Sequence, residues 1–120
     1  MEDKTTLRTM TSAALVAGKR LLEVKPTRLV SAKDFLTTAD ILSGQIIRQN
    51  LAARFPEIPF FGEEDGQTMG ATEIQWVVDE VDGSVNFYHG DEHWGISIAL
   101  VREGRSVAGA VYLPAKKQLF

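Results

Sequence analysis

The sequence predicts an α+β fold in which a pair of helices packs on an antiparallel sheet. Three observations support this prediction: two amphipathic helical segments come first, short apolar runs follow, and turn signals separate those runs. Helices that precede a series of strands are typical of a layered α+β domain. No internal repeat or low-complexity segment interrupts the order.

The first predicted helix has apolar residues at intervals of three and four positions, which places them on one face. They are Leu7, Met10, Ala14, Ala17 and Leu21. Pro26 ends this helix, because proline lacks a backbone donor and clashes with the preceding turn. We interpret the segment as a packing helix.

The second predicted helix has the same periodicity at Leu42, Ile46, Ile47, Leu51 and Phe55. Thr37 or Thr38 is the expected N-cap, which would place Asp40 in the first turn. The helix dipole favours a carboxylate there. Local sequence alone therefore leaves Asp40 either as a helix-start acid or as a residue with a further role.

The remaining segments have strand character. A short apolar strand is expected at 60–61, a stronger one at 74–78, and two more at 95–101 and 106–112, which Glu103-Gly104 joins as a hairpin turn. Residues 118–120 start a further strand. Because strands usually run about five to six residues, we expect the chain to be part of a longer protein.

Composition excludes several classes of function. The chain has 120 residues, 16 acidic and 13 basic, and 44% are hydrophobic, which is typical of a globular protein. The absence of cysteine excludes disulfides and thiol catalysis. A net charge of -3 without a basic run argues against a nucleic-acid partner. With neither a secretory signal nor a long apolar run, we expect a cytoplasmic protein without a membrane partner.

Acidic residues gather after two predicted strands, at 63–65 and at 79–82. If these strands are neighbours, their carboxylates converge on one edge, where each pair at 4 Å repels by about 4 kcal/mol at an effective dielectric of 20. Either some carboxylates carry a proton, with a raised pKa, or a cation lies among them. Oxygen ligands suit Mg²⁺, Mn²⁺ or Ca²⁺.

Gly83-Ser84 follows the second acidic group directly. Glycine permits a sharp turn, and Ser84 is expected to cap a short helix whose first amides bind an anion. A cation site beside an anion site suits phosphate-ester hydrolysis. The spacing excludes an EF-hand, and no Walker A motif occurs. A glycosidase with two carboxylates stays open, although it leaves the Gly-Ser turn unexplained.

Residues 79–87, D-E-V-D-G-S-V-N-F, resemble the signature of the inositol monophosphatase family, D-P-[ILV]-D-G-[ST]-x-N-[FY]. Residues 34–40 look like its D-x-V-T-x-x-D segment and residues 59–64 like its strand leading into G-E-E. The runs beginning S-I-A-L at 97 and G-A-V-Y at 109 are similar to its later strands. Order and spacing agree over residues 34–120.

The resemblance implies the layered αβαβα sandwich of the inositol monophosphatase and fructose bisphosphatase-like fold. Residues 1–120 would be the N-terminal portion of one such domain, comprising the helix pair and the antiparallel sheet. The C-terminal half, including a metal-binding Asp in a W-D-x-A-A type motif, is absent from this sequence and is expected as a partner. The family is part of the lithium-sensitive phosphatase superfamily, and the resemblance further implies a homodimer.

The resemblance also implies metal ligands. Glu63 would bind a metal ion and help to orient the attacking water, and Asp79 would bridge two ions. The main-chain carbonyl of Val81 would bind one ion, and Asp82 would bind a second. Glu80 stands where the family usually has proline, which would loosen the loop and add a negative charge nearby.

The other implied residues handle phosphate and water. Gly83 and Ser84 would present backbone amides to the phosphate, and the Ser84 hydroxyl would help to activate the water. Asp40 would be a catalytic acid near that water, and Glu64 an acid of the outer shell.

The implied activity is that of a phosphoric monoester hydrolase with two or three Mg²⁺ ions, or Mn²⁺ in their place, in which a metal-activated water attacks phosphorus directly. Substrates in related families include inositol monophosphate, sugar bisphosphates, nucleotide 3′-phosphates and histidinol phosphate. The alternative is a non-catalytic regulatory or binding domain that keeps the fold and a metal or anion site. We expect the 120-residue chain alone to be inactive, because one metal ligand belongs to the missing half.

Overall fold

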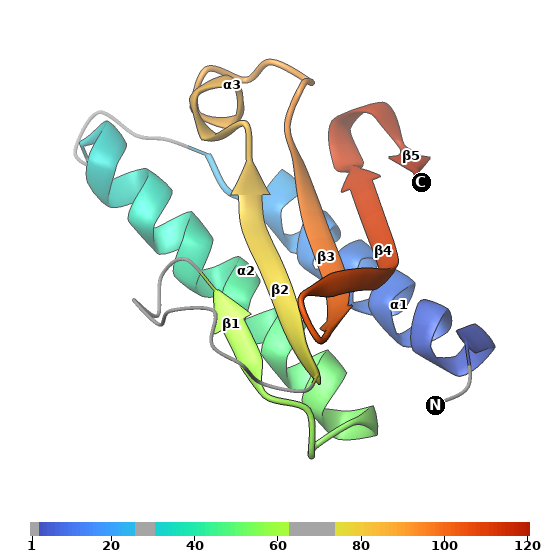
Figure 1. Cartoon of the computed structure of the whole chain (residues 1–120). Coiled ribbons are helices and arrows are strands. Elements are labelled where there is room, and N and C mark those ends of the chain that lie inside the picture. Colours follow the sequence, from blue (N-terminus) through green and yellow to red (C-terminus); the bar gives the residue numbers. More distant parts are fainter. Residues whose placement is uncertain (1–2, 26–30, 63–73) are drawn as a thin grey trace.

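The computed structural model describes residues 3–25, 31–62 and 74–120 (Figure 1). Two long helices, α1 (Asp3–Leu22) and α2 (Ala32–Arg54), precede the sheet. Its strands are β1 (Phe60–Gly62), β2 (Ile74–Asp82), β3 (Gly95–Arg102), β4 (Arg105–Leu113) and β5 (Gln118–Leu119). A short helix, α3 (Ser84–Tyr88), joins β2 to β3, and a 3₁₀ turn, η2 (Pro114–Lys116), joins β4 to β5.

The five strands lie in sequence order, and β2 to β5 are antiparallel neighbours, so the predicted helix pair and antiparallel sheet are confirmed. The first strand adds a feature that was not predicted: β1 runs parallel to β2, with Phe60 opposite Trp76 and Gly62 opposite Val78. Parallel neighbours end at the same edge of a sheet. The carboxyl end of β1 therefore lies beside Val78, the residue before Asp79 in β2.

The core lies between the helices and one face of the sheet. Alternate residues of β2 and β3 are buried on that face, with Trp76 opposite Leu100 and Val78 opposite Ile98. Helix α1 lies against β3 and β4, and α2 lies against β2 (Figure 1). Among the described residues, no helix is long and apolar enough to cross a membrane.

Helix α1 buries four of the five residues predicted for its apolar face, whereas Leu7 is 43% exposed. The helix approaches β4 closely at Gly18, where an added Cβ would lie 2.6 Å from the ring of Tyr112. A side chain at this position would force the helix and the strand apart.

Helix α2 begins earlier than predicted. The Ser31 side chain accepts a hydrogen bond from the Asp34 amide at 3.1 Å and is the N-cap. The prediction of Thr37 or Thr38 as the cap is wrong: both lie inside the helix, and their hydroxyls donate to carbonyls four residues earlier. Asp40 accordingly lies in the third turn, and not in the first.

The predicted hairpin turn between β3 and β4 is confirmed. Glu103 and Gly104 both have positive φ, of 51° and 80°. Two consecutive left-handed residues form the type I′ turn that matches the twist of a two-residue hairpin.

Candidate functional site

The candidate site lies at the carboxyl end of β2, beyond the point where the shorter β1 ends beside Val78 (Figure 1). Asp79 is half-buried within β2, the Val81 side chain is buried, and Asp82 is exposed at the last position of the strand. Two predicted site residues, Glu63 and Glu64, follow β1 in the sequence and lie outside the described residues. The pairing of the two acid-bearing strands was only a condition of the predicted convergence, and the register of β1 and β2 meets that condition.

A bulge interrupts β2 within the acidic segment. Asp79 lies opposite Ser97 and Asp82 opposite Gly95, so three steps along β2 face only two along β3. An extra residue of this kind bends the strand and changes the direction of its side chains. As a result Glu80 and Val81, which are adjacent in sequence, are both buried.

Glu80, which stands where the family usually has proline, lies on the helix side of β2. Its side chain is only 4% exposed and packs against α2, where an added Cβ on Gly44 would lie 3.3 Å from the Glu80 carboxylate. Strand alternation places Asp79 on the opposite face of β2. The departure from the family's proline therefore places a carboxylate between the strand and the helix.

Gly83 makes the turn from β2 into α3. Its φ and ψ of 82° and 42° are left-handed, and an added Cβ would lie 2.8 Å from the carbonyl oxygen of His93. Only glycine fits this backbone without strain. Gly83 itself is the N-cap of α3, so the prediction that Ser84 caps the helix is wrong; Ser84 is the first helical residue.

Aromatic rings hold α3 in place against the start of α2. Phe87, which is buried, stacks on Phe35 with 5.5 Å between ring centroids. The Phe87 ring also meets Trp94, just before β3, edge-on at 4.6 Å. Such contacts stabilise beyond their buried area, so they fix the turn at Gly83 relative to both neighbouring elements.

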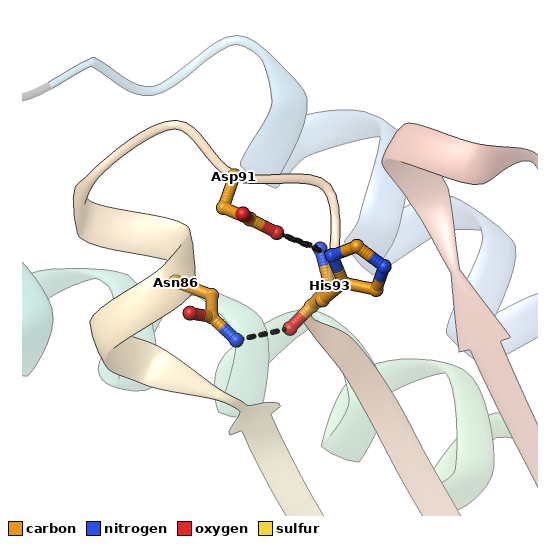
Figure 2. A network of polar contacts seen from close by, with 3 residues as sticks. All are labelled: Asn86, Asp91 and His93. Carbon is orange, nitrogen blue, oxygen red and sulfur yellow. Dashed lines mark hydrogen bonds and ion pairs between the residues drawn. The ribbon is translucent and has the colours of Figure 1, made fainter.

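A polar network closes the loop between α3 and β3 (Figure 2). The Asn86 side chain donates to the His93 carbonyl at 2.9 Å, and the His93 amide donates to the Asp91 carboxylate at 2.7 Å. A nitrogen of the His93 ring lies 2.6 Å from the same carboxylate oxygen. The hydrogen bond from the His93 amide, followed by that from its ring, lowers the pKa of Asp91. The His93 carbonyl accepts the hydrogen bond from Asn86 and also lies beside Gly83. The network therefore supports the turn at Gly83.

The lowered pKa predicts how this loop responds to acid. A carboxylate whose pKa is depressed in the folded state stabilises the fold above its ordinary pKa, and this contribution disappears as pH falls through the depressed value. We expect the NMR signal of the His93 amide to shift with a midpoint below the ordinary aspartate value of 3.8. Asp91→Asn should abolish that transition. A midpoint at or above 3.8 would contradict the prediction.

Asp40 lies toward the site along α2. The helix runs opposite to β2, since Phe35 near its start contacts Phe87 in α3, and Phe55 at its end contacts Trp76 near the start of β2. Ser43 contacts β2 at Glu80. Asp40 is half-buried and lies one turn before Ser43, and therefore farther toward the carboxyl end of β2, because the helix and the strand run in opposite directions.

Two residues that contact the acidic segment were missed by the sequence analysis. Ser43 and Gly44 are both buried on α2 and both touch Glu80. The sequence feature that could have identified them is the pair of small residues directly after Leu42, on the apolar face of the helix.

The donor atoms of the described part of the site are oxygens. Two carboxylates, Asp79 and Asp82, flank the Val81 carbonyl, a set that suits hard cations such as Mg²⁺. No group of three or more His, Cys, Asp or Glu side chains gathers within the described ranges. The described donors therefore fit part of a metal site.

The arrangement of helices and sheet is that of a known class of α+β protein. A solved structure of the extragenic suppressor protein suhB from Bartonella henselae superposes with a TM-score of 0.81 at 32% identity, over 97% of this chain and 47% of that chain. The sequence profile of the Inositol monophosphatase family matches residues 3–120, and the chain belongs to this family of phosphatases.

Individual relatives carry different names. The inositol-1-monophosphatase of Rhizobium meliloti is 36% identical over 121 residues, which are 95% of this chain and 46% of the relative. The Nus factor SuhB of Pasteurella multocida is 37% identical over 95 residues, covering 78% of this chain and 36% of the relative. The chain thus spans less than half the length of these relatives.

Proposed function

We propose that this chain contributes the metal-binding and phosphate-binding part of a Mg²⁺-dependent phosphomonoesterase that acts on a small phosphorylated metabolite. The observation that carries the proposal is the parallel pairing of β1 with β2. It places the end of β1 beside Val78, directly before the acidic segment of β2 that leads into the Gly83 turn. The family membership supports phosphatase chemistry of this kind.

The proposed cation site uses Asp79, Asp82, the Val81 carbonyl and Glu63, of which the first three are described oxygen donors. Mg²⁺ bound there would polarise the phosphoryl oxygens and lower the pKa of a water molecule. Mn²⁺ would suit the same ligands. Glu64 is proposed as an outer acid.

The proposed roles of the other residues come from the family motifs that they match. The backbone amides of Gly83 and Ser84 would bind phosphate, because they lie where β2 turns into α3. Asp40, on the adjacent side of α2, and the Ser84 hydroxyl would orient the attacking water together with Glu63. The chain's own contribution is therefore to hold a phosphate and a water in line.

The substrate is proposed as inositol monophosphate or a related sugar, nucleotide or histidinol phosphate. We further propose that residues 1–120 are one portion of a single domain whose other portion completes the site. The homodimer and the cytoplasmic location stay predictions.

A metal-dependence assay of the full-length gene product tests this function. We expect hydrolysis of inositol 1-phosphate, or of another ester in a panel of small phosphate esters, with Mg²⁺. Chelation by EDTA should abolish turnover and added Mg²⁺ should restore it, because the metal supplies the activated water. The isolated 120-residue chain should show no turnover. Absence of hydrolysis by the full-length protein with either Mg²⁺ or Mn²⁺ would contradict the proposal.

A second candidate is a non-catalytic regulatory or binding domain that keeps the fold. The name of the Pasteurella multocida relative, Nus factor SuhB, favours this possibility. The same assay separates the two candidates: a regulatory domain would bind Mn²⁺ or inorganic phosphate without turning over any ester.

A further inference from the structure

The bulge in β2 is held from the side by α2. Ser43 is fully buried, and its hydroxyl donates a hydrogen bond to the Glu80 carbonyl at 2.9 Å. The two residues are 37 positions apart in the sequence, so this is a tertiary contact. A buried hydroxyl that donates to a carbonyl on another element fixes the distance between the two backbones.

The next residue of α2 adds a second contact at the same point. The ideal Cβ position on Gly44 lies 3.3 Å from the Glu80 carboxylate and 3.4 Å from its Cγ, so the Glu80 side chain occupies the space beside the helix backbone. Glycine is unfavourable in a helix interior, since it costs conformational entropy on folding. Here its missing side chain gives room to Glu80.

These contacts act on the segment that carries the proposed ligands. Glu80 lies directly between Asp79 and Val81, and the bulge covers all of the positions from Asp79 to Asp82. At a bulge, the regular hydrogen bonds between neighbouring strands are interrupted. Other contacts are then needed to fix the position of the strand backbone. The Ser43 hydrogen bond and the Gly44 packing are such contacts.

We propose that Ser43 and Gly44 are positioning residues that hold the β2 bulge, and so set the spacing of the oxygen ligands at Asp79, Val81 and Asp82. The metal part of this inference rests on the proposed function. The mechanical part, which is that the contacts of Ser43 and Gly44 hold the bulge, is independent of the proposed function. Ser43 and Gly44 act through Glu80 and touch neither metal nor substrate.

The experiment compares Ser43→Ala with Thr37→Ala in the full-length protein. Thr37 is a matched control, because its hydroxyl also donates from α2 but to Lys33 within the same helix. We expect Ser43→Ala to weaken Mn²⁺ binding by about 10-fold, as loss of an outer-shell partner typically does. Thr37→Ala should leave Mn²⁺ affinity unchanged. At saturating metal, KM for the phosphate ester should match the unaltered protein in both variants.

Hydrogen exchange supplies a readout that needs no metal. In the apo protein, the amides of residues 79–82 should exchange faster in Ser43→Ala than in Thr37→Ala, because the bulge loses its lateral hydrogen bond. Equal exchange of this segment in the two variants would overturn the positioning role. Faster exchange with unchanged Mn²⁺ affinity would overturn only the metal part. Failure of the unaltered protein to bind Mn²⁺ would overturn the proposed function, while the exchange result still decides the mechanical part.

A double-mutant cycle tests Gly44 independently, including the case in which Ser43→Ala does not fold. Gly44→Ala should speed exchange at 79–82 and weaken Mn²⁺ binding, because its Cβ would lie 3.3 Å from the Glu80 carboxylate and the buried side chain would have to shift by a few tenths of an ångström. In a Glu80→Ala background the same substitution should have no effect, since the displaced side chain is gone. Equal effects of Gly44→Ala in both backgrounds would overturn the pairing of Gly44 with Glu80.

Discussion

Replacing Asp82 by Asn in the full-length gene product is expected to lower kcat/KM for its phosphate ester by more than about 100-fold, beyond the usual effect of losing an outer-shell partner. The substitution keeps the shape of the side chain and removes the charge that would bind a hard cation. Asp82 is exposed at the end of β2, so its removal creates no cavity and should change the melting temperature little. Activity assays and thermal unfolding would measure the two effects.

Asp34→Asn is the matched control for Asp82→Asn. Asp34 is also exposed, but it lies in the first turn of α2 and not on β2. It should lose some helix stability through the dipole and keep its activity. Glu63→Gln should resemble Asp82→Asn if Glu63 is a ligand as proposed. Unchanged turnover in both Asp82→Asn and Glu63→Gln would show that the phosphatase assignment is wrong.

The second large effect is expected from Gly83→Ala. Alanine in the left-handed conformation costs about 1–2 kcal/mol, and its Cβ would lie 2.8 Å from the backbone oxygen of His93. Because that oxygen belongs to the backbone, relief requires the turn itself to move. A displacement of about 1 Å near the reacting groups lowers rates by about 100-fold, so we expect a loss of activity of that size.

Gly104→Ala separates backbone strain from displacement of the turn. Gly104 has a φ of 80°, close to the 82° of Gly83, but an added Cβ there meets nothing within 4 Å. Gly104→Ala should lower the free energy of unfolding by about 1–2 kcal/mol in urea titrations while activity stays unchanged. Gly83→Ala should lose more stability than this control. Equal losses, with full activity in both variants, would contradict a role for the Gly83 turn.

Much of the fold could be predicted because its signals are local. The period of apolar residues in α1, the alternation in β2 and β3, and the Glu103-Gly104 turn each depend on neighbouring positions. The predicted N-cap of α2 was wrong, although capping is also a local feature. Thr37 and Thr38 are residue types that often cap helices. Ser31 is the cap here, because its side chain accepts a hydrogen bond from the amide of Asp34, three residues later.

The candidate site could be predicted only in part, for a physical reason. The acidic groups and the Gly-Ser turn are visible in the sequence, but the pairing of their two strands was only a condition of the predicted convergence, which the register of β1 and β2 meets. The burial of Glu80 depends on Ser43 and Gly44, which are more than thirty positions away. A polar side chain on a strand gives no local sign that a glycine on a distant helix has made room for it.

The hairpin turn between β3 and β4 has a consequence for how the protein folds. Its two strands are joined by a two-residue turn and can pair within about 1–10 μs, whereas the parallel pairing of β1 with β2 joins residues farther apart in sequence, such as Phe60 and Trp76. Helix α1 packs on β4 through Gly18, so this hairpin offers an early surface for the helix. We expect the edge that carries the acidic residues to form last. The order of folding would then delay cation binding until the rest of the sheet exists.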